Sequence, residues 1–106
     1  MQNLAVQIVR FVEGGYPGWV ECELVDAAGH LHILQDKVPI FTAADLDADA
    51  QYPTPGFVRC EIVEHSQNEK GQALVRVSTV KPDSIESTAG LSEFTVLASV
   101  VSSSPD

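Results

Sequence analysis

The sequence PGWVECELV at residues 17–25 returns almost unchanged as PGFVRCEIV at residues 55–63. Six of the nine positions are identical, and two of the other three exchange similar residues, Trp for Phe and Leu for Ile. Each copy begins with Pro-Gly, which is typical of a turn, and then alternates apolar with other residues as a β-strand does. The repeat predicts two equivalent β-hairpins in one chain.

The first copy leads into a turn and a returning strand. Asp-Ala-Ala-Gly at residues 26–29 has Asp at the first position and Gly at the last, which a type I turn favours. Residues 30–37 are the predicted return strand. We expect Gly29 to adopt a left-handed conformation in this turn, because glycine does so without the steric cost of a Cβ atom.

The pairing register of this hairpin is predicted from its apolar pattern. Pairing Leu24 with Leu31 and Cys22 with Ile33 would gather the apolar side chains on one face. Pairing Leu24 with His32 would instead mix apolar and polar residues on the same face. Because one face must be buried, we expect the first register. The outer face would then carry Trp19, Glu21, Glu23, Val25, His30, His32 and Leu34.

The second copy is expected to form the matching hairpin. Residues 57–65 would pair with residues 72–80, and Cys60 would take the inward position that Cys22 takes in the first hairpin. The connecting loop, residues 66–71, is polar and longer than the first turn, which predicts a mobile loop.

The remaining segments complete an all-β chain. Strands are predicted at residues 4–13 and 91–101, and one helical turn at residues 43–47. An open sheet of short apolar strands would leave two edges free to aggregate. We therefore predict a small closed or nearly closed barrel of about six antiparallel strands, with a two-sheet sandwich as the alternative. Residues 1–101 would form this single domain and residues 102–106 a flexible tail.

Charge and composition limit the classes of partner. The chain is 44% hydrophobic and 20% charged, which is ordinary for a folded domain. Its formal net charge of −9 disfavours nucleic-acid binding, because phosphate backbones bind through Lys and Arg. The charge serves solubility, or it attracts a basic protein partner. A secretory signal and a long apolar run are both missing from the sequence, which predicts a cytoplasmic protein that binds no membrane.

The two cysteines, Cys22 and Cys60, are predicted to be buried and reduced. A single pair does not make a disulfide framework, and a thiol on the apolar side of a strand behaves as a small hydrophobe. A disulfide between the two hairpins is the first alternative. Metal ligation is less favoured, because neither cysteine belongs to a Cys-x-x-Cys pair.

A resemblance can be named on several of these residues. The run Val20-x-Cys22-x-Leu24-x-Asp26-Ala27-x-Gly29-x-x-His32, followed by Lys37-Val38-Pro39, is similar to a family of small bacterial proteins without an assigned function. The Cys60 strand and the segment at residues 85–94 resemble it too. The resemblance implies an all-β bacterial protein and transfers neither an activity nor a catalytic residue.

A metal site is one candidate for function. His30 and His32 would share a strand face, with Glu23 opposite His32 in the expected register. Two imidazoles and a carboxylate are ligands that transition metals accept. The alternative is a hydrated strand face that carries a His–Glu pair.

Catalytic signatures are missing from the sequence. A nucleophilic Ser or Cys needs a base and an orienting group, and the sequence has neither a Gly-x-Ser-x-Gly motif nor a Gly-rich phosphate loop. The sequence therefore predicts a protein that is not an enzyme and that needs no cofactor.

Apolar residues on the predicted outer face are the main candidate for a binding site. They would either be covered by loops or form a contact surface for a partner, since aromatic residues with a polar rim are typical of interface centres. We predict an acidic, non-catalytic protein-binding module of the inhibitor, immunity or adaptor type, or a self-associating one. A small-ligand or metal-binding barrel that uses His30 and His32 is the alternative. The predicted contact residues are Trp19, Leu34, Phe57 and Leu74.

Overall fold

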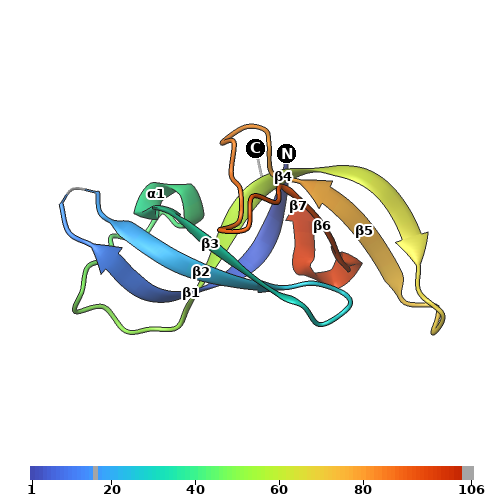
Figure 1. Cartoon of the computed structure of the whole chain (residues 1–106), viewed down its shortest axis with the longest axis horizontal. Coiled ribbons are helices and arrows are strands. Elements are labelled where there is room, and N and C mark those ends of the chain that lie inside the picture. Colours follow the sequence, from blue (N-terminus) through green and yellow to red (C-terminus); the bar gives the residue numbers. More distant parts are fainter. Residues whose placement is uncertain (16, 104–106) are drawn as a thin grey trace.

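The protein is an all-β chain in the computed structural model, which describes residues 1–15 and 17–103 (Figure 1). Two short helical segments interrupt the strands. The elements are β1 (Gln2–Glu13), β2 (Trp19–Val25), β3 (Leu31–Lys37), α1 (Val38–Phe41), β4 (Thr54–Gln67), β5 (Ala73–Ser78), β6 (Glu93–Leu97), the 3-10 helix η1 (Ala98–Val100) and β7 (Val101–Ser103).

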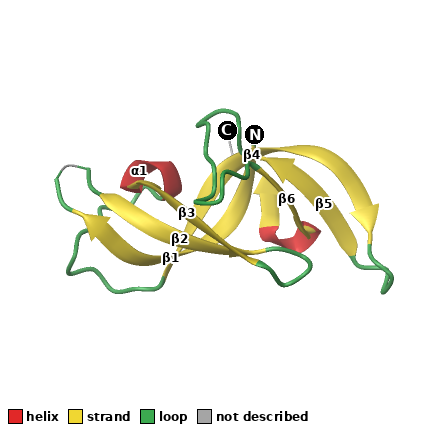
Figure 2. Ribbon diagram, in the orientation of Figure 1, coloured by secondary structure: helices red, strands yellow, loops and turns green. Residues whose placement is uncertain are grey.

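One antiparallel sheet contains all the strands, in the order β3-β2-β1-β4-β5-β6, with β7 paired to β1. The two long strands, β1 and β4, each pair with different neighbours along their length. Residues 2–8 of β1 pair with β4, and residues 7–13 pair with β2. Residues 54–60 of β4 pair with β1, and residues 61–67 pair with β5. The sheet curls because each long strand bends from one neighbour to the next (Figure 2).

The two ends of the curled sheet meet. The backbone N–H of Ala27, in the turn between β2 and β3, donates to the carbonyl oxygen of Thr95 in β6 at 2.9 Å. The N–H of Thr88, in the segment before β6, donates to the carbonyl oxygen of Ile33 in β3 at 2.8 Å. These contacts join the two ends of the sheet and confirm the predicted nearly closed barrel.

The inward faces of the strands form one core. Cys22 and Cys60 are both fully buried, free thiols at matching positions of the repeat, as the sequence predicts. Burial raises the pKa of Cys22 to about 12 and that of Cys60 to about 11, so both stay protonated at neutral pH. The core residues are Leu4, Val6, Ile8, Val20, Cys22, Leu24, Leu34, Val38, Phe41, Val58, Cys60, Val75, Val77, Ile85, Phe94 and Val96.

The register of the first hairpin differs from the prediction. Leu24 pairs with His32 and Cys22 pairs with Leu34, one residue away from the expected pairing. Leu34 is therefore fully buried, whereas Leu31 is 54% exposed. The expectation that Leu34 lies on the outer face is wrong.

Two partners of His32 explain this register. Its Nε2 donates to Oδ2 of Asp26 at 2.8 Å, and its ring meets the ring of Phe94 edge-on with centroids 4.9 Å apart. A polar side chain can be placed inward when its hydrogen bond is satisfied there. The apolar pattern of the strand does not reveal either partner, because both lie outside it.

Three turns of the chain share one hydrogen-bonding pattern. In each, a side-chain oxygen of the first residue accepts from the backbone N–H groups two and four residues later. The N–H of the first residue also donates to the carbonyl oxygen four residues later. The acceptors and donors are Asp26 with Ala28 and His30, Asn68 with Lys70 and Gln72, and Ser87 with Ala89 and Leu91.

The second hairpin therefore ends in a turn as tight as the first. Strand β4 continues to Gln67, so the prediction that the loop at residues 66–71 is longer than the first turn is wrong. Gly29 has a φ of +85° and Gly71 a φ of +78°, which confirms the left-handed glycine predicted for the first turn. The polar composition of this loop does not predict that Asn68 makes the same hydrogen bonds as Asp26.

The helical turn lies earlier than predicted. It covers Val38–Phe41 with Pro39 in its first turn, and Thr42 returns to an extended conformation, so the prediction for residues 43–47 is wrong. Val38 and Phe41 are both buried, one helical turn apart. Burial of this apolar pair outweighs the capping pattern that pointed to residues 43–47.

The sheet extends further toward the C-terminus than predicted. Ser102 pairs with Asn3 and Ser103 with Gln2 as part of β7, so these two residues belong to the sheet. Residues 104–106 of the predicted tail lie outside the described residues.

The two Pro-Gly dipeptides of the repeat serve different purposes. Gly18 has a φ of +80°, and a Cβ atom there would lie 2.7 Å from the ring of Phe11. Gly56 lacks a left-handed φ, but a Cβ atom there would lie 2.8 Å from Cδ1 of Ile8 and 3.0 Å from the carbonyl oxygen of Phe41. The glycine is thus required by both backbone conformation and close packing in the first copy, and by close packing alone in the second.

We expect Gly18→Ala to destabilise the fold more than Gly29→Ala. Both glycines have a left-handed φ, which costs an alanine roughly 1–2 kcal/mol. At Gly18 the clash with Phe11 should add about 1–3 kcal/mol, whereas nothing lies within 4 Å of a Cβ at Gly29. Urea unfolding of both variants measures the difference. Equal losses would contradict the packing assigned to Gly18.

Candidate interaction surface

Exposed apolar side chains form a row across the outer face of four adjacent strands. Val25 in β2 pairs with Leu31 in β3, and Ala5 in β1 pairs with Phe57 in β4. The pairing of β1 with β2 ends at Gln7 and Glu23, and the same register extended by two residues places Ala5 level with Val25. Leu31, Val25 and Phe57 are 54%, 59% and 47% exposed. We call these four residues the apolar row.

A pocket of about 290 Å³ opens in the middle of this row. On one side, β1 pairs with β7 up to Leu4 and with β2 from Gln7 onward. Ala5 and Val6 have no strand partner on that side in the described part of the chain. Val100 of η1 borders the resulting gap. The lining residues are Ala5, Val6, Gln7, Glu23, Leu24, Val25 and Val100.

The charge around the row is mainly negative, because the arginines are already paired with acids. Arg10 bridges to Glu21 at 3.0 Å, and Arg59 bridges to Asp83 at 2.8 Å. Arg76 contacts two further acids, one of them at 2.7 Å. Within residues 1–15 and 17–103, the acids without an ion pair are Glu13, Glu23, Asp36, Asp45, Asp47, Asp49, Glu61, Glu69 and Glu86.

The pairing with Arg10 favours the ionised form of Glu21. The hydrogen bonds from Arg10, and then the one from the Gln35 amide at 2.8 Å, hold the pKa of Glu21 below its usual value. Glu23, two residues further along the same outer face, has no such partner among the described residues. Glu23 is therefore the acid at the row that is available to an external cation.

The four predicted contact residues lie in four different places. Phe57 is part of the apolar row. Trp19 is partly buried on the same outer face, but six residues before Val25, which is about 20 Å along an extended strand. Leu74 is partly buried in β5, and Leu34 is in the core. The predicted set therefore does not form one surface.

Leu74 borders a second pocket, of about 300 Å³, where the turns of the two hairpins approach each other. Its lining is mostly apolar. The side-chain oxygens of Asp26 and Asn68 border this pocket, but each already accepts hydrogen bonds from two backbone N–H groups of its own turn. The lining residues are Asp26, Ala27, Ala28, Asn68, Leu74 and Thr95.

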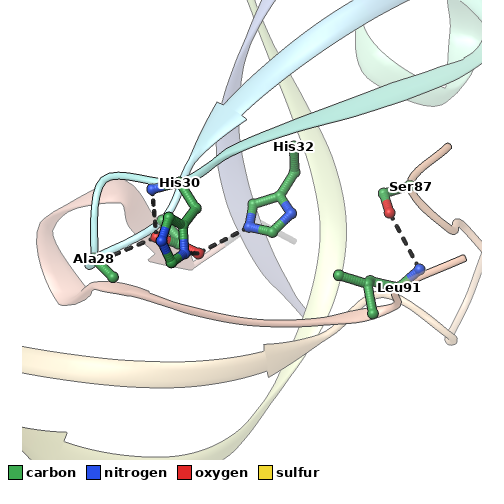
Figure 3. A network of polar contacts seen from close by, with 6 residues as sticks. Ala28, His30, His32, Ser87 and Leu91 are labelled. Carbon is green, nitrogen blue, oxygen red and sulfur yellow. Dashed lines mark hydrogen bonds and ion pairs between the residues drawn. The ribbon is translucent and has the colours of Figure 1, made fainter. Parts of the chain in front are cut away.

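The histidine pair belongs to the first turn. Figure 3 shows His30 and His32 beside this turn, near the hydrogen bond between Ser87 and Leu91. His30 Nδ1 lies 3.7 Å from Asp26 Oδ2, which also accepts from His32. The carboxylate of Asp26 is thus shared between the backbone of its own turn and two imidazoles.

The predicted metal site does not assemble. Glu23 pairs with Ile33 on the outer face, whereas His32 is on the inner face of its strand, so the expected Glu23–His32 pair is wrong. Within residues 1–15 and 17–103, no three His, Cys, Asp or Glu side chains are arranged to hold a metal ion. The prediction failed because it depended on the register that Asp26 overrides.

The environment of Asp26 favours its ionised form. Partial burial alone would raise the pKa of Asp26, but the hydrogen bonds from His32, His30 and Ala28 lower it by more. The pKa of Asp26 therefore lies below its usual value. The ionised carboxylate accepts these hydrogen bonds more strongly than the protonated acid would, so ionisation of Asp26 stabilises the turn.

Comparisons with known proteins add no relative. No family model matches the chain, and no curated protein or solved structure is significantly similar to it. The resemblance to a bacterial family stays a prediction. In the described part of the chain, none of the helices has the length and apolar character that crossing a membrane requires.

Three members of the apolar row, Leu31, Ala5 and Val25, were not among the predicted contact residues. Leu31 was expected in the core because of the wrong register. Ala5 belongs to the row only through its pairing with Phe57, which joins distant parts of the chain. The exposure of Val25 follows from strand alternation, and that signal is present in the sequence.

Proposed function

We propose that this protein is a non-catalytic binding module that contacts another protein through the apolar row. The observation that carries the proposal is the alignment of Leu31, Val25 and Phe57 across neighbouring strands, each about half exposed. Single exposed apolar residues are common on protein surfaces, but aligned ones are typical of contact sites. A sheet face with an apolar centre and a polar rim matches the anatomy of protein interfaces.

Charge supports a basic partner over a second copy of the chain. The formal net charge is −9, and the three arginines are paired within the molecule. Two copies meeting through the same face would bring like charges such as Glu23 together, which weakens association. A partner with excess Lys and Arg would be attracted at long range and would contact these acids at the rim.

Photo-cross-linking tests this proposal. A benzophenone amino acid placed at Phe57 or at Leu31 should form adducts with one discrete protein of basic isoelectric point in the cells that make this chain. The same amino acid at Ala48, which is exposed in the loop between α1 and β4, is the matched control and should not form that adduct.

Formation of the cross-linked adduct must also depend on the apolar row and on the attraction between opposite charges. Val25→Asp should abolish it, and added salt should weaken it, because the attraction between exposed charges is screened. Adducts that are equal at Ala48 and Phe57, adducts only between copies of this chain, or the lack of any adduct would contradict the proposal.

A further inference from the structure

The pocket in the apolar row indicates which side chains the partner presents to this face. It lies at the point where the partner of β1 changes from β7 to β2, so Ala5 and Val6 have no strand partner on that side in the described part of the chain. With about 290 Å³ it is at the lower limit of pockets that hold a small molecule, but it has room for one large apolar side chain. The side chains of Val25 and Val100 form apolar walls.

A negative charge lies at the rim of this pocket, at a fixed distance from one of its apolar walls. Glu23 lines it together with Val25, two residues further along β2. Residues two apart on a strand point to the same side and are about 7 Å apart. An extended peptide has the same period, so it can present an apolar and a basic side chain at matching positions.

We propose that the pocket binds an extended partner segment in which a Leu-sized apolar residue is followed or preceded, two positions away, by Lys or Arg. The apolar side chain fills the gap between β1 and β2, and the cation contacts the Glu23 carboxylate. This inference rests on the proposed function in that it names what the partner presents to the same face.

The expected ligand preference can be measured without the natural partner. The probes are the tripeptides Ac-Leu-Gly-Lys-NH2, Ac-Leu-Gly-Glu-NH2 and Ac-Gly-Gly-Lys-NH2, titrated into the full chain and followed by amide chemical shifts. We expect Ac-Leu-Gly-Lys-NH2 to shift the amides of Ala5, Val25 and Val100 most strongly. The probe without leucine should bind about ten-fold more weakly, because it buries little apolar surface.

Glu23→Gln separates the charge contribution from the apolar one. It should reduce the preference for Lys over Glu in the probe, which we expect to be about three-fold in the parent, since exposed ion pairs contribute little. Glu61→Gln is the matched control, because Glu61 is another exposed acid on the outer face, without an ion pair in the described residues. It should leave the preference unchanged.

The outcomes distinguish this inference from the proposed function. Equal binding of the three tripeptides, shifts away from the pocket, or equal effects of Glu23→Gln and Glu61→Gln would overturn the inference. None of these results affects cross-linking at Phe57, so the protein-binding proposal would stand without the pocket. Conversely, selective binding of Ac-Leu-Gly-Lys-NH2 together with failed cross-linking would support the pocket and reject the proposed protein partner.

Discussion

Leu34→Ala is expected to lower the free energy of unfolding by about 2–5 kcal/mol, the usual loss for a buried leucine. Leu34 is fully buried opposite Cys22, whereas Leu31 is 54% exposed on the other face of the same strand. Leu31→Ala should therefore change stability by less than about 0.5 kcal/mol, as most surface substitutions do.

The pair of variants decides the register of the first hairpin. Urea unfolding of both, with the slope of the transition checked for constancy, gives the two changes in stability. A large loss for Leu31→Ala with a small one for Leu34→Ala would mean that the strand is shifted by one residue. The apolar row would then lose one of its members.

Asp26→Ala is expected to cost about 3 kcal/mol. The substitution leaves the N–H groups of Ala28 and His30 without an acceptor and removes the acceptor of His32. Hydrogen bonds to charged groups contribute about 1.5–3 kcal/mol each, and the carboxylate is only partly accessible to solvent. Asp26→Asn should cost less, because an amide oxygen serves the same two N–H groups in the turn at Asn68.

Acid titration gives this prediction a second measurement. The pKa of Asp26 is lower in the folded protein than in the unfolded chain, so the stability it contributes is present above the unfolded pKa of about 4. It is lost as the pH falls through the lower folded pKa. The difference in stability between the parent and Asp26→Asn should therefore shrink below about pH 4. A difference that is constant from pH 7 to pH 3 would show that the charge of Asp26 contributes nothing.

Strand alternation predicted much of the fold correctly. It placed Cys22 and Cys60 inward, because a period of two on a half-buried strand is a local property of the chain. It failed at His32, which the pattern treats as an outer residue. The inward position of His32 depends on Asp26 and Phe94, and the contact with Phe94 joins distant parts of the chain.

The candidate surface was less predictable than the fold for the same reason. Its individual residues are visible in the sequence as apolar residues on strands. Their alignment depends on the pairing of β1 with β4, which brings Phe57 next to Ala5. The pocket depends on β7, a three-residue strand inside the segment predicted as the last strand and tail. Sequence patterns within one strand contain no information about such pairings.

The most direct test of the protein-binding account is the affinity of the cross-linked partner for matched surface variants. Val25→Asp places a charge in the centre of the apolar row. Val63→Asp places the same charge on β4 at a similar exposure, 47% against 59%, and six residues beyond Phe57. Both variants should fold as the parent does, because both side chains are already about half exposed.

Titration calorimetry with the purified partner measures the two affinities. We predict that Val25→Asp weakens binding at least ten-fold, since residues at the centre of an interface commonly contribute more than about 1 kcal/mol. Val63→Asp should leave the affinity within about two-fold of the parent. Equal affinities of the parent and Val25→Asp would contradict the protein-binding account and remove the apolar row as the contact surface.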